Sequence, residues 1–203
     1  MLALRRTLIP LALAAFAATA LACSDSSGPD PDPGPNIVRL APTAPPLAQT
    51  QITFWAKYGQ SVEEKMWFQD DVGENGEEFL RFKIPSNGLL AYPDGRPFGT
   101  DDSVRITIRM VDPPLLLFEM SPAGLRFNPD EPAELEIEYA ESDDDLNEDG
   151  EIDEEDDALE LQLAVWRQAT LDADFERLIT RLEVDLEEIE ADLVGFSRYA
   201  IAY

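Results

Sequence analysis

The chain lacks histidine altogether, and among its 203 residues cysteine occurs once, at Cys23. Without histidine, neither a Ser-His-Asp triad nor a Cys-His pair can form, and the usual histidine and cysteine ligands of zinc are missing. A single cysteine excludes a disulfide within the chain, so the core must be held by packing alone. No glycine-rich loop of the phosphate-binding kind occurs either. These absences remove several common catalytic classes, and we expect the protein not to be an enzyme.

Positive charge is also scarce. The chain has 15 Lys and Arg residues against 42 Asp and Glu residues, which gives a net charge of −27. A surface of this sign repels nucleic acid and attracts cations. We therefore expect no nucleic-acid partner, and a cation is the ligand that the composition favours.

Residues 1–22 have the organisation of an export signal. Arg5 and Arg6 form a positive start, and the apolar run Leu8–Ala18 is too short to span a bilayer. The run ends in Ala20-Leu21-Ala22-Cys23, which resembles the lipobox of bacterial lipoproteins. This resemblance implies cleavage before Cys23 and lipidation of its thiol, for example by palmitate. Ordinary signal-peptidase cleavage, which leaves a free thiol, is the alternative.

Residues 23–36 read as the lipidated cysteine followed by a tether rich in Pro, Asp and Gly. Its four prolines favour an extended, polyproline-like spacer. The resemblance then implies a lipid-anchored protein of a bacterial cell envelope, at the outer membrane or cell surface and facing the periplasm or the exterior. Ser24, directly after the cysteine, favours the outer membrane. Residues 37–203 are long enough for one domain with its own core.

From residue 37 onward the dominant hydrophobic period is two, as in strands that bury one face. Asn75-Gly76 predicts a type I′ hairpin turn, and 93–95 and 121–124 predict further turns. Many short strands separated by turns indicate an all-β fold, an antiparallel β-sandwich. The expected strands are 51–57, 65–69, 78–84, 104–110, 115–120, 134–139, 159–165 and 197–203.

The segment 141–157 combines residue types and spacing that specify one chemistry, calcium coordination. Calcium takes about six to eight oxygen ligands, and alternate side chains of a tight loop can point at one ion. In a twelve-position frame, Gly150 stands at position six, where the loop turns sharply. The candidate calcium ligands are Asp145, Asn147, Asp149, Glu151 through its backbone carbonyl, Asp153 and Asp156.

This D-x-N-x-D-G pattern resembles EF-hand loops and the calcium repeats of dockerins, and it closes with Asp156 where EF-hands prefer Glu. Ile152 at position eight suits an inward anchor. The alternative is a solvated acidic loop, because twelve of the seventeen residues are acidic. Acidity explains neither Asn147 nor Gly150, so we favour a weak calcium site with a Kd of the order of 10⁻⁴–10⁻³ M. We expect it to join the 134–139 and 159–165 strands.

The segment 177–194 fits two structures. Leucine and isoleucine residues of 175–193 form a helical stripe, whereas fewer of them fit a β-hairpin. Segments 118–127 and 132–139 resemble the β-sandwich module of ankyrins and netrin receptors, which implies a hairpin here. Some relatives of that module cleave their chain between Phe and Ser with a histidine as base. Gly195 occupies the position of that histidine, so we expect no autoproteolysis. Phe196 and Tyr199 should instead be core residues.

These features together predict a membrane-anchored, calcium-binding β-sandwich lipoprotein that acts as a surface binding or scaffold module. Its expected partner is a protein or a glycan at the cell surface. A carbohydrate-active enzyme on the same fold is one alternative, and it would need a pair of carboxylates across a cleft. A purely structural lipoprotein with a disordered acidic loop is another. Trp55 and Trp67 suit sugar stacking, but tryptophans more often pack on a sheet face.

Overall fold

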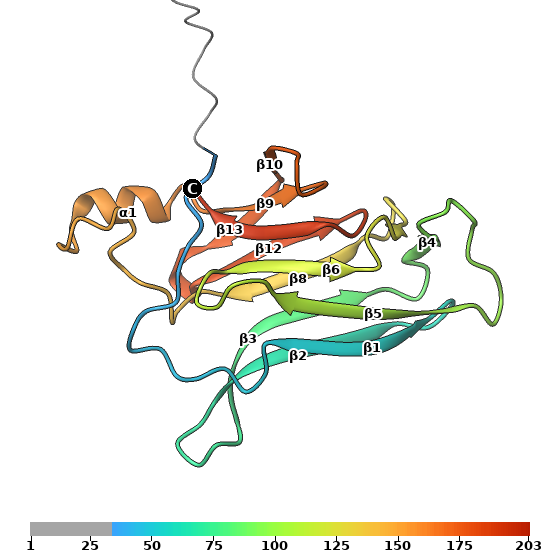
Figure 1. Cartoon of the computed structure of the whole chain (residues 1–203), viewed down its shortest axis with the longest axis horizontal. Coiled ribbons are helices and arrows are strands. Elements are labelled where there is room, and N and C mark those ends of the chain that lie inside the picture. Colours follow the sequence, from blue (N-terminus) through green and yellow to red (C-terminus); the bar gives the residue numbers. More distant parts are fainter. Residues whose placement is uncertain (1–33) are drawn as a thin grey trace, which may run out of the picture. The chain divides into compact units, whose positions relative to one another are not determined.

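The computed structural model describes residues 34–203, which form one compact unit (Figure 1). The predicted signal peptide, the lipidation site Cys23 and most of the tether lie outside the described residues. Within 34–203, no helix is both long and apolar enough to cross a membrane.

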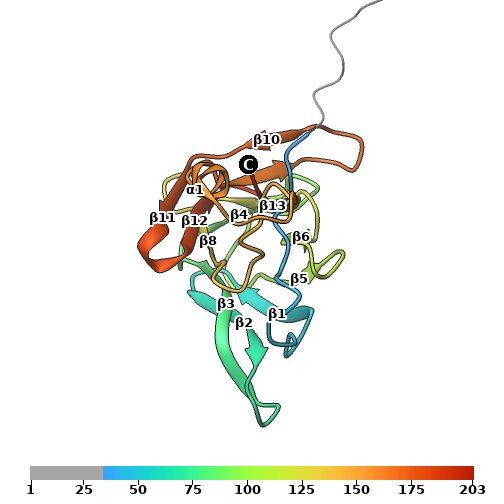
Figure 2. The same cartoon turned by 90° about the vertical axis from the view of Figure 1, so that its left-hand side faces the viewer.

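The fold is an antiparallel β-sandwich, as the sequence predicts, and Figure 2 shows it from the end that carries the short helix α1 (Glu154–Glu160). The six-stranded sheet has the order β1 (Gln51–Lys57), β5 (Ser103–Met110), β6 (Leu117–Ser121), β13 (Arg198–Ala202), β9 (Ala164–Gln168) and β10 (Phe175–Arg177). The five-stranded sheet has the order β11 (Thr180–Glu183), β12 (Glu188–Leu193), β8 (Ala133–Glu138), β3 (Asn75–Ile84) and β2 (Val62–Gln69). The short strands β4 (Leu89–Ala91) and β7 (Arg126–Phe127) form a separate pair.

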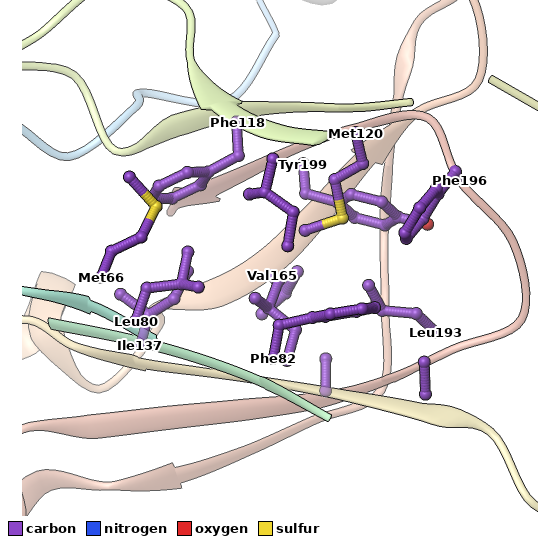
Figure 3. Packing of buried hydrophobic residues seen from close by; sticks show 14 of the residues in the cluster. Met66, Leu80, Phe82, Phe118, Met120, Ile137, Val165, Leu193, Phe196 and Tyr199 are labelled. Atoms are coloured by element: carbon purple, nitrogen blue, oxygen red, sulfur yellow. The ribbon is translucent and has the colours of Figure 1, made fainter. Parts of the chain in front are cut away.

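The core lies between the two sheets because alternate residues of each strand point inward (Figure 3). Phe82 of β3 stands at an aromatic cluster, with its ring centroid 6.3 Å from Phe54, 6.3 Å from Phe127 and 5.6 Å from Phe196. Phe196 and Tyr199 are buried, which confirms their prediction as core residues.

The segment 177–194 is a hairpin, and the helical alternative is wrong. Strands β11 and β12 pair antiparallel with Leu182 opposite Ile189, and the 3₁₀ turn η1 (Val184–Leu186) joins them. The helical stripe fails because tertiary packing buries a period-two set in β12, whereas Ile179 on the same stripe is 96 % exposed.

Two other local predictions are corrected. The expected strand 159–165 is helix α1 followed by β9, which begins only at Ala164. The β2–β3 hairpin exists, but Asn75 and Gly76 belong to strand β3, and the turn precedes them at 70–74. The turns at 93–95 and 121–124 are present, with Gly95 and Gly124 at positive φ.

Candidate metal site

The acidic segment 141–157 runs from β8 into α1 and contacts both the first and the last residues of the folded domain, which are paired with each other. The backbone amide of Asp143 donates to the carbonyl of Arg39 at 2.8 Å, and the Arg39 guanidinium pairs with Glu148 at 3.1 Å. At the C-terminus, the Tyr203 hydroxyl donates to the carbonyl of Leu146. The acidic segment is therefore bonded both to the entry segment near residue 39 and to Tyr203.

The first half of the predicted loop is organised by its own side chains. The two carboxylate oxygens of Asp145 accept from the amides of Asp149 at 3.0 Å and Gly150 at 2.8 Å. Asn147 Oδ1 accepts from Asp149 at 2.9 Å, and Asp149 Oδ1 accepts from Glu151 at 2.9 Å. Gly150 has a φ of +89°, so the glycine at position six supplies the left-handed turn that the motif requires.

The second half of the loop is also the start of α1. Asp153 is the N-cap, and its Oδ1 accepts from the amide of Glu155 at 2.8 Å. Asp156 reaches backwards with both oxygens, to the amide of Asp153 at 3.0 Å and to the amide of Asn147 at 3.1 Å. This carboxylate at position twelve therefore closes the loop onto position three.

Asp156 is the one charged residue that is buried in the described part of the chain, at 3 % exposure. The amide of Asp153 lowers the pKa of the Asp156 carboxyl below its usual value; burial opposes this, and the amide of Asn147 adds to it. Asp156 is thus held as a carboxylate, yet it has no cationic partner among residues 34–203. A buried anion without a counter-ion is the feature that a bound cation would satisfy.

The predicted ligands are brought into one loop, but not into a closed coordination shell. Across the described residues, no three side chains of Asp, Glu, His or Cys lie in an arrangement that could hold a metal ion. The amide oxygen of Asn147 and the backbone carbonyl of Glu151 belong to other ligand classes. The carboxylates are instead occupied by backbone amides, and Asp153 Oδ1 is committed to the helix cap.

Ile152 is not the inward anchor that its position predicts, since it is 69 % exposed. The apolar contact of the loop is made by Leu146, which packs on the core. The loop is also followed by α1, so it joins a strand to a short helix and not two strands.

Two hollows flank the loop. One, of about 350 Å³, lies between Arg39, Asn147 and Tyr203. The other, of about 250 Å³, lies between Tyr139, Asp156 and Glu160. The Tyr139 hydroxyl donates to Glu160 at 3.0 Å, and burial, followed by this bond to a carboxylate, raises the tyrosine pKa. Both hollows are partly lined by acids, so they suit cations better than anions.

The Phe196-Ser197 bond lies beside a cation and not a base. Arg167 Nε donates to Ser197 Oγ at 3.0 Å, and the Tyr199 hydroxyl donates to the carbonyl of Gly195. A guanidinium has no lone pair with which to take the serine proton. The absence of autoproteolysis stays a prediction, and this contact supplies a physical reason for it.

Sequence reasoning missed a carboxylate pair on the outer face of the five-stranded sheet. Burial, followed by a hydrogen bond with Glu188, raises the pKa of Glu136 to about 7, although the charge of Arg81 opposes the rise. The two acids belong to adjacent strands, and only strand pairing brings them together. The alternation of Glu with apolar residues in β8 and β12 was the available signal, but it does not specify the partner strand.

The chain matches no protein-family model, no curated protein and no solved structure. The likeness to the module of ankyrins and netrin receptors, and that of the loop to EF-hands and dockerins, therefore stays an expectation from the residues that carry it.

Proposed function

We propose that the protein is a calcium-binding β-sandwich lipoprotein, anchored to a bacterial envelope membrane through Cys23, that acts as a surface binding or scaffold module. The observation that supports the calcium site best is Asp156, a buried carboxylate without a cationic partner at the closing position of the loop. Calcium is the cation of choice because the loop offers only hard oxygen ligands.

The ion would be held by Asp145, Asn147 and Asp149 in the first half of the loop and by Asp156 at its end. Glu151 would contribute its backbone carbonyl. Because Asp153 Oδ1 accepts from the helix cap, this residue would act through its other oxygen or through water.

The proposed calcium ion has a structural role, which is to stiffen the loop. The loop holds the entry segment near residue 39 through Arg39, through the Asp143 amide, and through a bridge between Leu40 and Ser142. This segment is the point at which the domain continues into the N-terminal tether. An ion that stiffens the loop therefore strengthens the attachment that carries any pull from the membrane anchor.

Calcium titration of the full chain in neutral detergent tests the site. With a Kd of about 10⁻⁴–10⁻³ M, 10 mM calcium (an assay concentration of about 10–100 Kd) stabilises the fold by about 1.4–2.7 kcal/mol. For a domain of this size the melting temperature should rise by roughly 3–10 °C. Melting that is the same in calcium and in chelator would refute the site.

Two variants separate coordination from general charge relief. Asp156→Asn should abolish the calcium-dependent rise in melting temperature, and Asp145→Asn should act alike. Asp157→Asn is the matched control, because it removes the same charge from the next residue, which is exposed. An equal loss of the calcium response in Asp157→Asn would show that calcium only screens the negative charge of the acidic segment and does not bind at one site.

A further inference from the structure

The outer face of the six-stranded sheet carries a strip of exposed side chains that the calcium site does not use. In strand β1 and its neighbour β5, the outward positions pair across the strands, with Trp55 opposite Arg105. Over the seven residues of β1 the strip is about 20 Å long. Its main side chains are Thr53, Trp55, Lys57, Arg105, Thr107 and Arg109.

The strip carries one more positive than negative charge, counting its two paired acids, although the chain as a whole is strongly negative. Lys57, Arg105 and Arg109 lie on it, and Glu119 of β6 and Asp101 at its margin are the nearby acids, paired with Arg109 at 2.5 Å and Lys57 at 3.6 Å. The outer face of the five-stranded sheet has the opposite character, with the acids of β8 and β12 in its centre. Since charges are screened beyond about 8 Å in physiological salt, a ligand in contact with the strip meets its local charge.

Two side chains of the strip are without partners. Trp55 is 66 % exposed, and Arg105 makes no ion pair or side-chain hydrogen bond within residues 34–203. Next along the strands, the hydroxyls of Thr53 and Thr107 lie 3.0 Å apart. By contrast, Trp67 on the other sheet is half-buried, with Lys65 Nζ 5.6 Å from its ring centroid.

We propose that the β1–β5 face binds an anionic glycan, a polysaccharide that carries carboxylate groups. The C–H face of one sugar ring packs on the Trp55 indole, the Arg105 guanidinium binds a sugar carboxylate, and the paired threonine hydroxyls bond to ring hydroxyls. This inference rests on the proposed surface-binding role, and it does not depend on the calcium loop.

The chemistry of the strip favours a glycan over a membrane or a protein. Trp55 is its one large apolar side chain, which is too little for a hydrophobic docking patch of several hundred Å². Its hydroxyls, single indole and unpaired guanidinium instead match a flat ligand that has apolar C–H edges, many hydroxyls and negative charge.

Affinity electrophoresis of the full chain in neutral detergent tests the proposal, with polygalacturonate in the gel and dextran as the neutral glycan. We expect retardation by polygalacturonate alone. Trp55→Ala and Arg105→Ala should each weaken binding roughly tenfold or more, which is the loss expected for a hydrogen bond to a charged group or a stacking contact. Binding should also weaken at higher ionic strength, because the strip is exposed.

Matched controls are available on other surfaces. Trp67→Ala removes a tryptophan from the opposite sheet, and Arg126→Ala removes another exposed arginine, from β7. Both should bind as the wild type does. Melting curves of all four variants establish that each is folded.

Several results would overturn the proposal. These are no retardation by polygalacturonate, equal retardation by dextran, or equal losses in the control variants. Competition by mixed micelles of phosphatidylglycerol that depends on Trp55 would assign the strip to a membrane surface instead. Repeating the gels with calcium and with chelator separates this site from the loop, because glycan binding should persist in a variant that has lost the calcium response.

Discussion

The outer face of the five-stranded sheet places like charges directly opposite one another, and this arrangement should make the fold sensitive to pH. Acids directly opposite each other on adjacent strands destabilise a sheet. Among these acids, Glu136 has a side-chain exposure of 18 % and a pKa raised to about 7. The opposed pairs of β8 and β12 are Glu138 with Glu188, Glu136 with Glu190, and Glu134 with Asp192.

The direction of the pKa shift determines the direction of the effect. The pKa of Glu136 is about 7 in the folded state and 4.5 for an ordinary glutamate, so the folded chain binds this proton more tightly. At pH 8 the charged group destabilises the fold in full, and its cost disappears as the pH falls from about 7 to about 4.5. The difference between a pKa of about 7 and one of 4.5 amounts to at most about 3 kcal/mol. Because the group still reaches solvent, we expect about 1–3 kcal/mol.

Glu136→Gln tests this reasoning by urea unfolding at pH 8 and pH 5. At pH 8 the variant should be about 1–3 kcal/mol more stable than the wild type, and at pH 5 most of the difference should be gone. Glu119→Gln is the matched control, because Glu119 lies on the other sheet and pairs with Arg109, as Glu136 pairs with Arg81. Asp156 has a lowered pKa, so its contribution is lost only below about pH 3.8, outside this window. A Glu136→Gln variant that is less stable at pH 8, or no different from the control, would refute the argument.

Two further predictions concern packing and are measured by thermal or urea unfolding. Phe82→Ala should cost about 3–5 kcal/mol, because it empties the centre of the aromatic cluster, whereas Leu186→Ala at an exposed site should change stability by less than about 0.5 kcal/mol. Gly76→Ala should cost about 1 kcal/mol or more, since its new Cβ would lie 3.0 Å from the backbone nitrogen of Asp70. Gly99→Ala, whose nearest contact would be 3.9 Å, should be tolerated, and an equal loss in both glycine variants would contradict the clash.

Most strands could be predicted because a half-buried strand records its buried face in the sequence. In β5, Val104, Ile106 and Ile108 alternate with polar residues, and all three are buried. The hairpin at 177–194 was harder, since its apolar residues fit two periods, and the burial of Ile189 and Leu193 against the core decides between them. Which strands pair with each other cannot be predicted from any one segment, because each pairing depends on two segments that lie apart in the sequence.

The strand expected at 159–165 fails for a different reason. Leu159, Leu161 and Leu163 alternate as in a strand, but a capping box at Asp153 and Asp156 starts a helix before them. Asp153 and Asp156 fit both a calcium loop and a capping box, so the calcium pattern in the sequence hides the helix start.

The Asn75-Gly76 signal was overridden by a nearby competitor. Asp70 Oδ1 accepts from the amides of Val72 at 3.0 Å and Glu74 at 2.7 Å, and Gly73 has a φ of +82°. An aspartate that bonds to the amides following it forms a turn of its own, which places the chain reversal at 70–74, directly before Asn75.

The double role of Asp156 bears on how calcium would act. Because Asp156 bonds to the amide of the N-cap residue Asp153 and also to the amide of Asn147, the loop and the helix form one hydrogen-bonded unit built from the chain's own amides. A carboxylate oxygen has a second lone pair, so it can accept from an amide and also face a cation. The loop's own hydrogen bonds therefore already define its shape, and a bound ion would stiffen and stabilise that shape. A bound ion would then stabilise the loop chiefly by reducing the electrostatic repulsion among the many acids in 141–157.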